Sequence, residues 1–314
     1  MTGFIIRRIL QAVIVALGVT LIVFALEHAL PGSVARDILG NRATPQSITQ
    51  FNQLNHLNQP VYTQYWYFLV KLAHGNLGFS YEYNRSVDSL LKADLPRDLV
   101  LGGVSLLLSL LIAIPIGIAQ AVKRNKAIDY VGTGVSFVLY SMPQYAIALL
   151  LIQLLAITFH VFPSEAPQSG AVGGLFSDPL ALVLPIASLT LVTYALFSRY
   201  MRSSAIDTLA QDYMRTARAK GLPERIVLWR HLLRNSLIAV VTLVGLSLPT
   251  VITGTLIIEQ VFNYPGVGLE YFSAALRNDY EVMLGITVLV GVVTVVGNLV
   301  ADIGYAILDP RIRY

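Results

Sequence analysis

The residues with the clearest chemical character in this 314-residue chain lie in one stretch, from Asp212 to Asn235, here called the basic segment. It carries six basic side chains against two acidic ones, in surroundings that are almost entirely apolar. Such a segment either docks on a partner protein or lies on anionic lipid, where each basic residue gains about 1 kcal/mol. The basic residues are Arg215, Arg218, Lys220, Arg225, Arg230 and Arg234.

Apolar residues recur at helical spacing along this stretch. Those from Ile206 to Ala217 form one stripe, and a second set continues toward Leu233. Between them, Gly221 suits the position after a helix end, and Pro223 suits the first turn of a second helix. We therefore predict a helix, a tight turn and a second helix, with arginines flanking an apolar surface ridge. Docking into a partner's groove and contact with lipid both remain open.

The chain offers little for catalysis of its own. It contains no cysteine, which excludes disulfides, thiol catalysis and cysteine-based metal sites. There is no G-x-x-x-x-G-K-[ST] phosphate loop and no H-E-x-x-H pair, and the five histidines are scattered. We expect no metal site and no ATP site in this chain.

The composition identifies an integral membrane protein. The chain is 55% hydrophobic and only 13% charged, well below the roughly 25% charged residues of soluble domains. Several apolar stretches reach the roughly 20 residues needed to cross a bilayer. The net charge of +4 and the pI near 9.2 then reflect membrane topology rather than nucleic-acid binding. The six predicted spans are Ile9 to Leu30, Val100 to Val122, Tyr130 to Phe159, Leu180 to Tyr200, Ser236 to Phe262 and Val282 to Leu308.

The basic residues between the spans predict the orientation. Lysine and arginine concentrate in the loops that would share one side with both termini, so both termini and the basic segment are expected in the cytoplasm. The first span is expected to be retained, because its apolar core from Ile9 to Leu26 is longer than that of a typical signal peptide. The long polar segment 31–99 would lie outside as a small folded unit, with helical patterns at 45–57 and 60–73.

Ionisable and helix-breaking residues in the spans are the next candidates. Glu259 and Asp302 would either line or gate the substrate path, or form inter-helix pairs or caps inside the bundle, and the second interpretation is preferred. Pro143, in the third span, is either a hinge or a packed kink. Close helix packing is predicted at three glycines of the sixth span, Gly285, Gly291 and Gly297.

Several stretches of the chain resemble one family. "DYMRTARAKG", followed after nine residues by "HLLRN", resembles the cytoplasmic "EAA" loop of ABC-importer permeases, in the variant typical of dipeptide, oligopeptide and nickel permeases. "RRILQAVIVALGVTLIVFALEHALPG", "QPVYTQYWYFLVKLAHGNLGFSY", "YSMPQY", "IIEQVFNYPGVG" and "LDPRIRY" agree with the first permease subunit of those systems. The resemblance extends over essentially the whole chain.

This resemblance implies an all-α polytopic membrane protein with six transmembrane helices, the type I ABC importer permease fold. Its parts would be the tail and first helix (1–30), an extracytoplasmic helical insertion (31–99) and a permease core (100–314) with a cytoplasmic coupling loop at 201–235. Arg215, Thr216 and Ala217 fall where the general family has Glu-Ala-Ala, and Gly221 is its glycine. The implied coupling residues are Asp212, Tyr213, Arg215, Thr216, Ala217, Arg218, Ala219, Lys220, Gly221, His231, Leu233, Arg234 and Asn235.

The implied function is transport of di- and oligopeptides, without enzyme activity in this chain. The implied partners are a second, homologous permease in a heterodimer, two cytoplasmic ATPases that bind ATP and Mg²⁺, an extracytoplasmic substrate-binding protein and membrane lipid. A nickel-chelate or oligosaccharide importer of the same family is the alternative. A stand-alone secondary carrier is the alternative from another class, but it should show carboxylates near mid-membrane, and the deeper spans have almost none.

Overall fold

The computed structural model describes residues 2–29, 44–54, 56–80, 82–168, 172–253 and 255–308. Within them the chain is almost entirely helical, with one short antiparallel hairpin of β1 (Phe79–Ser80) and β2 (Arg85–Ser86). The long helices are α1 (Thr2–Ala29), α5 (Val87–Val122), α6 (Ala127–Ser141), α9 (Val183–Leu209), α12 (Arg234–Thr253) and α15 (Tyr280–Leu308). The shorter ones are α3 (Pro45–Leu54), α4 (Val61–Ala73), α7 (Gln144–Leu151), α8 (Val172–Leu175), α10 (Asp212–Ala219), α11 (Glu224–Ile226), α13 (Leu256–Phe262) and α14 (Val267–Arg277).

Three further helical segments extend these elements. A π-helical segment, Ile152–Thr158, continues α7, and a 3-10 turn, Pro179–Leu182, leads into α9. A second π-helical segment, Val227–Leu233, joins α11 to α12, so that one helical run connects the basic segment to the fifth span.

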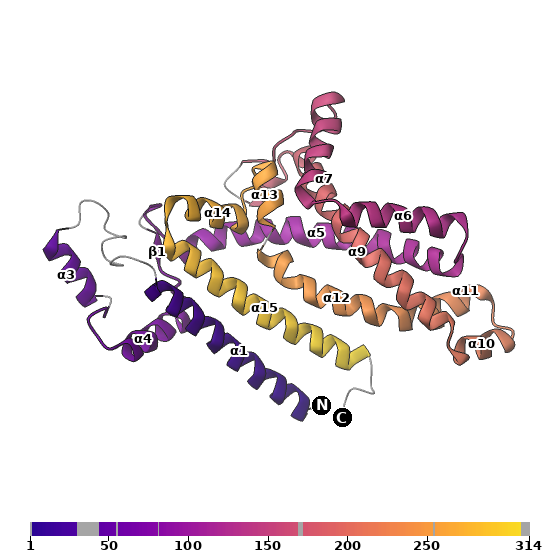
Figure 1. The fold of residues 1–314 in the computed structure, drawn as a ribbon, viewed down its shortest axis with the longest axis horizontal. Coiled ribbons are helices and arrows are strands. Elements are labelled where there is room, and N and C mark those ends of the chain that lie inside the picture. The colour runs from indigo at the N-terminus through magenta and orange to yellow at the C-terminus, as the bar shows by residue number, and fades with distance from the viewer. Residues whose placement is uncertain are drawn as a thin grey trace.

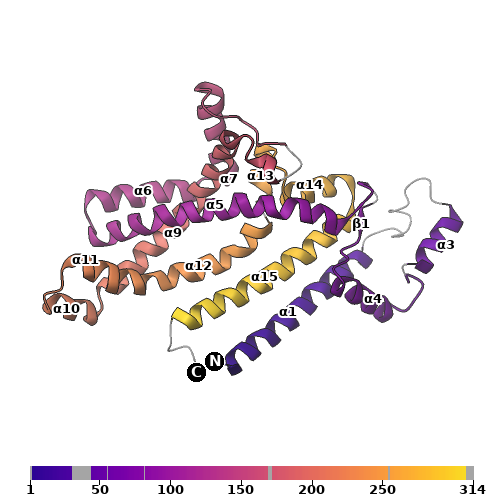
Figure 2. The same cartoon turned by 180° about the vertical axis from the view of Figure 1, so that it is seen from behind.

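The long helices lie side by side in an elongated bundle (Figures 1 and 2). Their order across it is α1, α15, α12, then α9 with α5, and finally α6. Helix α9 is the central one, with 56% of its apolar stretch buried. On the outside of the bundle, large apolar side chains such as Ile14 and Leu111 are exposed. Such a surface suits hydrocarbon rather than water.

Within the described residues, five helices are long and apolar enough to cross a membrane, and six if one bent pair counts as a span. This confirms a multi-pass helical fold. Helix α5 begins at Val87 rather than near Val100, and its 36 residues make it about 54 Å long, more than a bilayer core requires. Its first turns therefore extend beyond the hydrocarbon.

The third predicted span is not one continuous helix. Helix α6 ends at Ser141 and α7 begins at Gln144, with an angle of 104° between the two arms. Met142 has an extended conformation, with ψ of 135°. The ring of Pro143 disfavours the helical region for the residue before it, which explains the break. Pro143 thus ends one helix and precedes the next, a stronger effect than the kink expected from the sequence.

The fifth predicted span, Ser236 to Phe262, is also divided. Helix α12 ends at Thr253, and α13 begins at Leu256 after Thr255 in an extended conformation. The prediction of one helix was wrong because apolar length alone does not reveal where a chain leaves its helix to meet tertiary partners.

Small residues allow the close helix contacts that the sequence predicted. A Cβ atom placed on Gly291 would lie 2.4 Å from Val19 of α1, and one on Gly285 would lie 2.6 Å from Val87 of α5. A Cβ atom on Gly297 would lie 3.3 Å from Cδ of Pro249, which is a looser contact than the other two. The predicted packing role of these glycines is confirmed.

Two adjacent glycines of α5 provide a matched test of this packing. A Cβ on Gly102 would lie 2.8 Å from the Cα of Val251 on α12, whereas one on Gly103 would have no atom within 4 Å. We expect Gly102→Ala to lower the unfolding free energy by about 1–3 kcal/mol, because backbone cannot move aside cheaply. Gly103→Ala should be neutral or slightly stabilising, since alanine favours helix. Thermal unfolding of the detergent-solubilised protein measures both, and equal stability of the two variants would contradict the contact.

Candidate functional site

The basic segment folds, as predicted, into two helices joined by a tight turn. Gly221, just after α10, has φ of 72°, in the left-handed region. Its N–H donates to the carbonyl oxygen of Arg218 at 2.9 Å, and the N–H of Leu222 donates to that of Ala217 at 3.4 Å. This pair of hydrogen bonds is the Schellman motif, where glycine avoids the steric cost of a Cβ atom. Pro223 follows as the residue that caps the start of α11.

Part of the apolar stripe of the basic segment packs inward. Met214 and Ala217 of α10 pack in one buried cluster. Its other members include Val227 and Leu232 of the π-helical segment and Ala121 of α5. Because these side chains contact the chain's own helices, they are not available to a partner. The predicted apolar surface ridge was therefore wrong for these residues, whereas Tyr213, Ile226 and Trp229 of the predicted set are exposed: periodicity reveals that a helix has an apolar face but not which element covers it.

The outward face of the segment carries its charged side chains together with the exposed rings of Tyr213 and Trp229. The side chains of Asp212 and Arg215 are 97% and 77% exposed, with 3.7 Å between the carboxylate and the guanidinium. Across the turn, Arg218 donates from Nη2 and Nε to the two carboxylate oxygens of Glu224, at 2.8 and 3.3 Å. Exposed pairs contribute at most about 1 kcal/mol, so the main effect of this one is to orient α10 against α11.

The coupling residues implied by the family resemblance differ in how far their side chains are exposed to solvent. Ala217 is buried, and His231 and Leu233 are half-buried. The exposed ones are Asp212, Tyr213, Arg215, Thr216, Arg218, Ala219, Lys220, Gly221, Arg234 and Asn235. The exposed residues near the turn form the surface that a partner would meet.

Both ends of the basic segment are tied to long helices. The hydroxyl of Ser236, fully buried at the start of α12, lies 3.1 Å from that of Thr208 on α9. The hydroxyl of Ser204 donates to the carbonyl oxygen of Ser236 at 3.0 Å. Further along α9, Arg202 donates two hydrogen bonds, of 2.5 and 2.9 Å, to the carboxylate of Asp129 at the start of α6. The two long helices that adjoin the basic segment, α9 and α12, are thus bonded to each other, and α9 is bonded to α6.

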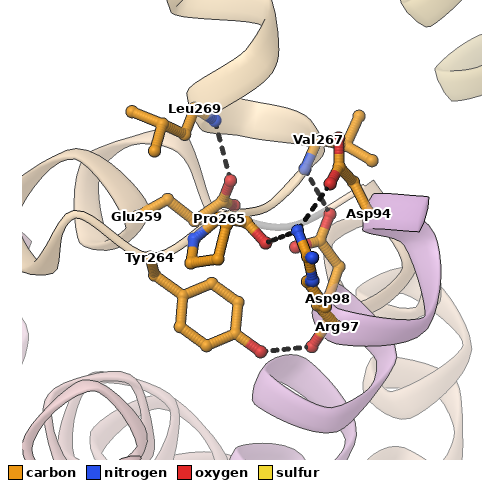
Figure 3. A network of polar contacts seen from close by, with 8 residues as sticks. All are labelled: Asp94, Arg97, Asp98, Glu259, Tyr264, Pro265, Val267 and Leu269. Carbon is orange, nitrogen blue, oxygen red and sulfur yellow. Dashed lines mark hydrogen bonds and ion pairs between the residues drawn. The ribbon is translucent and has the colours of Figure 1, made fainter. Parts of the chain in front are cut away.

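At the other end of the bundle, two carboxylates from different helices cap α14 (Figures 1 and 3). Asp98 of α5 accepts the N–H of Val267 at 2.9 Å, and Glu259 of α13 accepts the N–H of Leu269 at 2.8 Å. The first N–H groups of a helix have no partner within it, and the helix dipole favours negative charge there. Asp98 and Glu259 are both fully buried.

Arg97 and Tyr264 complete this arrangement (Figure 3). Arg97 donates from Nη1 to Asp94 at 2.9 Å and lies 3.4 Å from the carbonyl oxygen of Pro265. The hydroxyl of Tyr264, itself buried, donates to the carbonyl oxygen of Arg97 at 2.6 Å. Together Asp94, Arg97, Asp98, Glu259 and Tyr264 form what we call the cap network, which fastens the loop between α13 and α14 to α5.

The cap network encloses three carboxylates beside one guanidinium. One oxygen of Asp98 and one of Glu259 have no hydrogen-bond partner. Glu259 lies on α13, beyond the span that ends at Val251, and its burial raises the pKa of its carboxyl to about 7, although backbone N–H groups act in the opposite direction.

Two glycines make room for these carboxylates. A Cβ atom on Gly266 would lie 2.2 Å from Asp98 Oδ1 and 2.6 Å from Glu259 Oε2. A Cβ atom on Gly268 would lie 2.7 Å from the Cα of Leu256. The "NYPGVG" motif therefore has a packing reason: no other residue lets the loop approach the cap network so closely.

The three candidates for lining or gating the pathway have different positions. Glu259 is a cap inside the bundle, which is the interpretation preferred from the sequence. Pro143 lies at the break between α6 and α7. Asp302 belongs to α15, but its side chain lies outside the described ones. Among the described residues, no group of three or more His, Asp or Glu side chains is arranged to hold a metal ion.

Sequence reasoning missed several residues of these two regions. Asp94, Arg97 and Asp98 recur at helical spacing just before the second predicted span, which is a signal of one polar helix face. Nothing in the sequence joins that face to Glu259, and nothing joins Asp129 to Arg202. Both pairings depend on how helices far apart in the chain meet.

Comparison with known proteins agrees with this architecture. The family described as binding-protein-dependent transport system inner membrane component matches residues 113–314, and the N-terminal part of such membrane components matches residues 1–102. The oligopeptide transport system permease protein AppB of Bacillus subtilis is 38% identical to this chain, and OppB of Salmonella typhimurium is 35% identical. The glutathione transport system permease protein GsiC of Salmonella choleraesuis is 33% identical. Each alignment covers 100% of both chains.

These matches run the length of the chain and agree with its multi-pass helical bundle. The chain therefore belongs to the family of binding-protein-dependent transport system inner membrane components, and it is a membrane permease component of an ABC transporter rather than an enzyme.

Proposed function

We propose that this chain forms one half of the translocation pathway of an ABC importer for di- and oligopeptides. The observation that carries the proposal is its full-length similarity to relatives named oligopeptide and glutathione permeases. Peptide uptake by vesicles containing the complete transporter tests the substrate class. Uptake of a nickel chelate or an oligosaccharide in place of peptides would favour the alternative within the family.

In this proposal both termini and the basic segment face the cytoplasm, as the distribution of lysine and arginine indicates. A second, homologous permease completes the pathway, two cytoplasmic ATPases bind ATP and Mg²⁺, and an extracytoplasmic binding protein delivers substrate. This chain has no phosphate loop, so the chemical step belongs to the ATPases.

Helix α10 and the Gly221 turn are the proposed contact with an ATPase. Its exposed face carries charged side chains, while its other face is packed in the chain's own core. A helix held in this way moves as a rigid body. Closure of the ATPases on ATP would displace α10, and the ties of Ser236 to Thr208 and of Arg202 to Asp129 would pass that displacement to α12, α9 and α6.

The cap network is proposed to fix the outer end of the pathway during this movement. It fastens the loop between α13 and α14 to the long helix α5 through buried contacts. Buried groups of this kind hold one arrangement, because breaking them would leave charged or polar atoms without partners. Glu259 would then act in gating as a structural fastener rather than as a group that touches substrate.

Gly221 gives a direct test of the coupling role. No atom of this chain lies within 4 Å of a Cβ placed there, so within the chain a substitution acts through the positive φ alone. Gly221→Val should cost about 1–2 kcal/mol and unwind the end of α10, whereas Gly221→Asn tolerates this conformation. We expect peptide uptake and ATPase co-purification to fall roughly tenfold in the valine variant at equal membrane abundance, and to be kept in the asparagine variant. Normal values for both in Gly221→Val would refute the coupling role.

A substitution in the Arg202–Asp129 pair tests whether the proposed displacement of α10 reaches α6 through α9. Arg202→Lys keeps the charge but loses the two-pronged geometry, because an ammonium is a point charge. We expect this variant to hydrolyse ATP with the binding protein present while transporting fewer peptides per ATP, roughly twofold to fivefold fewer. The control is Arg124→Lys, an exposed arginine between α5 and α6 and outside the basic segment. If Arg202→Lys transports as many peptides per ATP hydrolysed as the unmodified protein does, the Arg202–Asp129 ion pair is not needed for coupling.

Glu259 predicts a pH dependence of stability. Its folded pKa of about 7 lies above its ordinary value of 4.5, so the folded protein keeps a proton that the unfolded chain has lost between those values. Stability contributed by this proton is present at low pH and declines as pH rises toward and through about 7. Glu259→Gln should flatten this decline in the thermal midpoint between about pH 5 and about pH 8, whereas Asp212→Asn, at an exposed site, should keep it. An unchanged slope in Glu259→Gln would contradict the assignment.

A further inference from the structure

Helix α4 attaches to the first span at a depth inside the apolar stretch. The hydroxyl of Tyr65 lies 3.0 Å from that of Thr20 and donates to the carbonyl oxygen of Leu17 at 3.2 Å. Both residues belong to the membrane-crossing part of α1, Ile6–Leu26. Thr20 is six residues before the end of that stretch, which at 1.5 Å per residue places the hydroxyl about 9 Å inside it.

The other contacts of α4 fix its level along α1. The ring of Phe68 lies 5.8 Å from that of Phe24, and Gln64 lies 3.0 Å from His28. Phe24 is within the last turn of the apolar stretch and His28 is just beyond it. Helix α4 therefore crosses α1 at the boundary between the apolar stretch and its polar continuation. Figures 1 and 2 show it at the end of α1 remote from the N-terminus, on the side away from α15.

The face of α4 that turns away from α1 is aromatic. Tyr62 and Trp66, one helical turn apart, are 78% and 63% exposed, and Tyr67 beside them is 38% exposed. At the same level α1 exposes Leu21, Ile22 and Leu26, so water there would meet a broad apolar surface. Tryptophan and tyrosine are the residues enriched at membrane–water interfaces, where an apolar ring and a polar atom are both accommodated.

We propose that α4 is an interfacial helix, whose Tyr62 and Trp66 face lies in the headgroup region of the outer leaflet. The segment between the first two spans is then partly a membrane-bound anchor for α1 rather than only a unit in the aqueous compartment. The occupant of this face is phospholipid. The proposal depends on the membrane class of the chain and, for the choice of leaflet, on the proposed orientation, but not on its peptide substrate.

Native tryptophan fluorescence tests the proposal with little perturbation. The chain has two tryptophans, so Trp229→Phe leaves Trp66 as its only one. The full-length variant is placed in bilayers whose phospholipids carry bromine either close to the headgroup or deep in the acyl chains, and iodide is the quencher in water. We expect bromine close to the headgroup to remove more of the Trp66 emission than deep bromine or iodide does.

Two reference variants calibrate the depth. In a background with both native tryptophans changed to phenylalanine, Ile14→Trp reports the middle of a span, and Asp212→Trp reports a fully exposed site in water. Iodide quenching of Trp66 equal to that of Asp212→Trp would overturn the proposal and indicate an aqueous face. Greatest quenching by deep bromine, as for Ile14→Trp, would place α4 in the hydrocarbon and also overturn it. Protection from every quencher would mean that protein covers the face, which is equally contrary to the proposal.

Discussion

A bilayer offers no hydrogen-bond partner to an open backbone, and the main features of this protein follow from that constraint. Each long helix satisfies its own backbone in the bilayer. Helix α14 begins inside protein, where water is also excluded, and its first N–H groups have no partners within the helix. Buried carboxylates on α5 and α13 satisfy them. Here acidic residues satisfy the buried helix end, and Gly266 leaves room for both of them.

The two polar regions of the molecule differ in kind. The cap network is enclosed, with its charged groups hydrogen-bonded to backbone from several elements, so it favours one arrangement. The basic segment has Met214, Ala217, Val227 and Leu232 packed inside and its charges in solvent, so it is a rigid element with a charged surface. Under the proposed function, in which partner ATPases move one end and the other end closes the pathway, rigidity at both ends would serve the same purpose. The hydroxyls of Ser236 and Thr208 bond the two helices that adjoin the basic segment, and the Arg202–Asp129 pair bonds α9 to α6.

Much of this architecture could be predicted from the amino-acid sequence. Apolar stretches of span length located the membrane helices, because the hydrocarbon thickness fixes the length that they need. Gly221 indicated its turn, since a left-handed residue after a helix is most often glycine. The glycines of the sixth span indicated close packing, and Glu259 was rightly preferred as a cap. The break at Pro143 was only partly foreseen, because a proline permits either a kink or a full bend, and packing chooses.

The sequence by itself determined the membrane class, the approximate spans and the turn in the basic segment, because each of these depends on residues that are close together in the chain. Tertiary structure alone decided which face of α10 remains exposed, which carboxylates cap α14, and where α4 rests on α1. These depend on contacts between residues far apart in sequence, such as Asp98 with Val267 and Tyr65 with Leu17. A local pattern records that a side chain is polar or apolar, but its partner is fixed only when the helices meet.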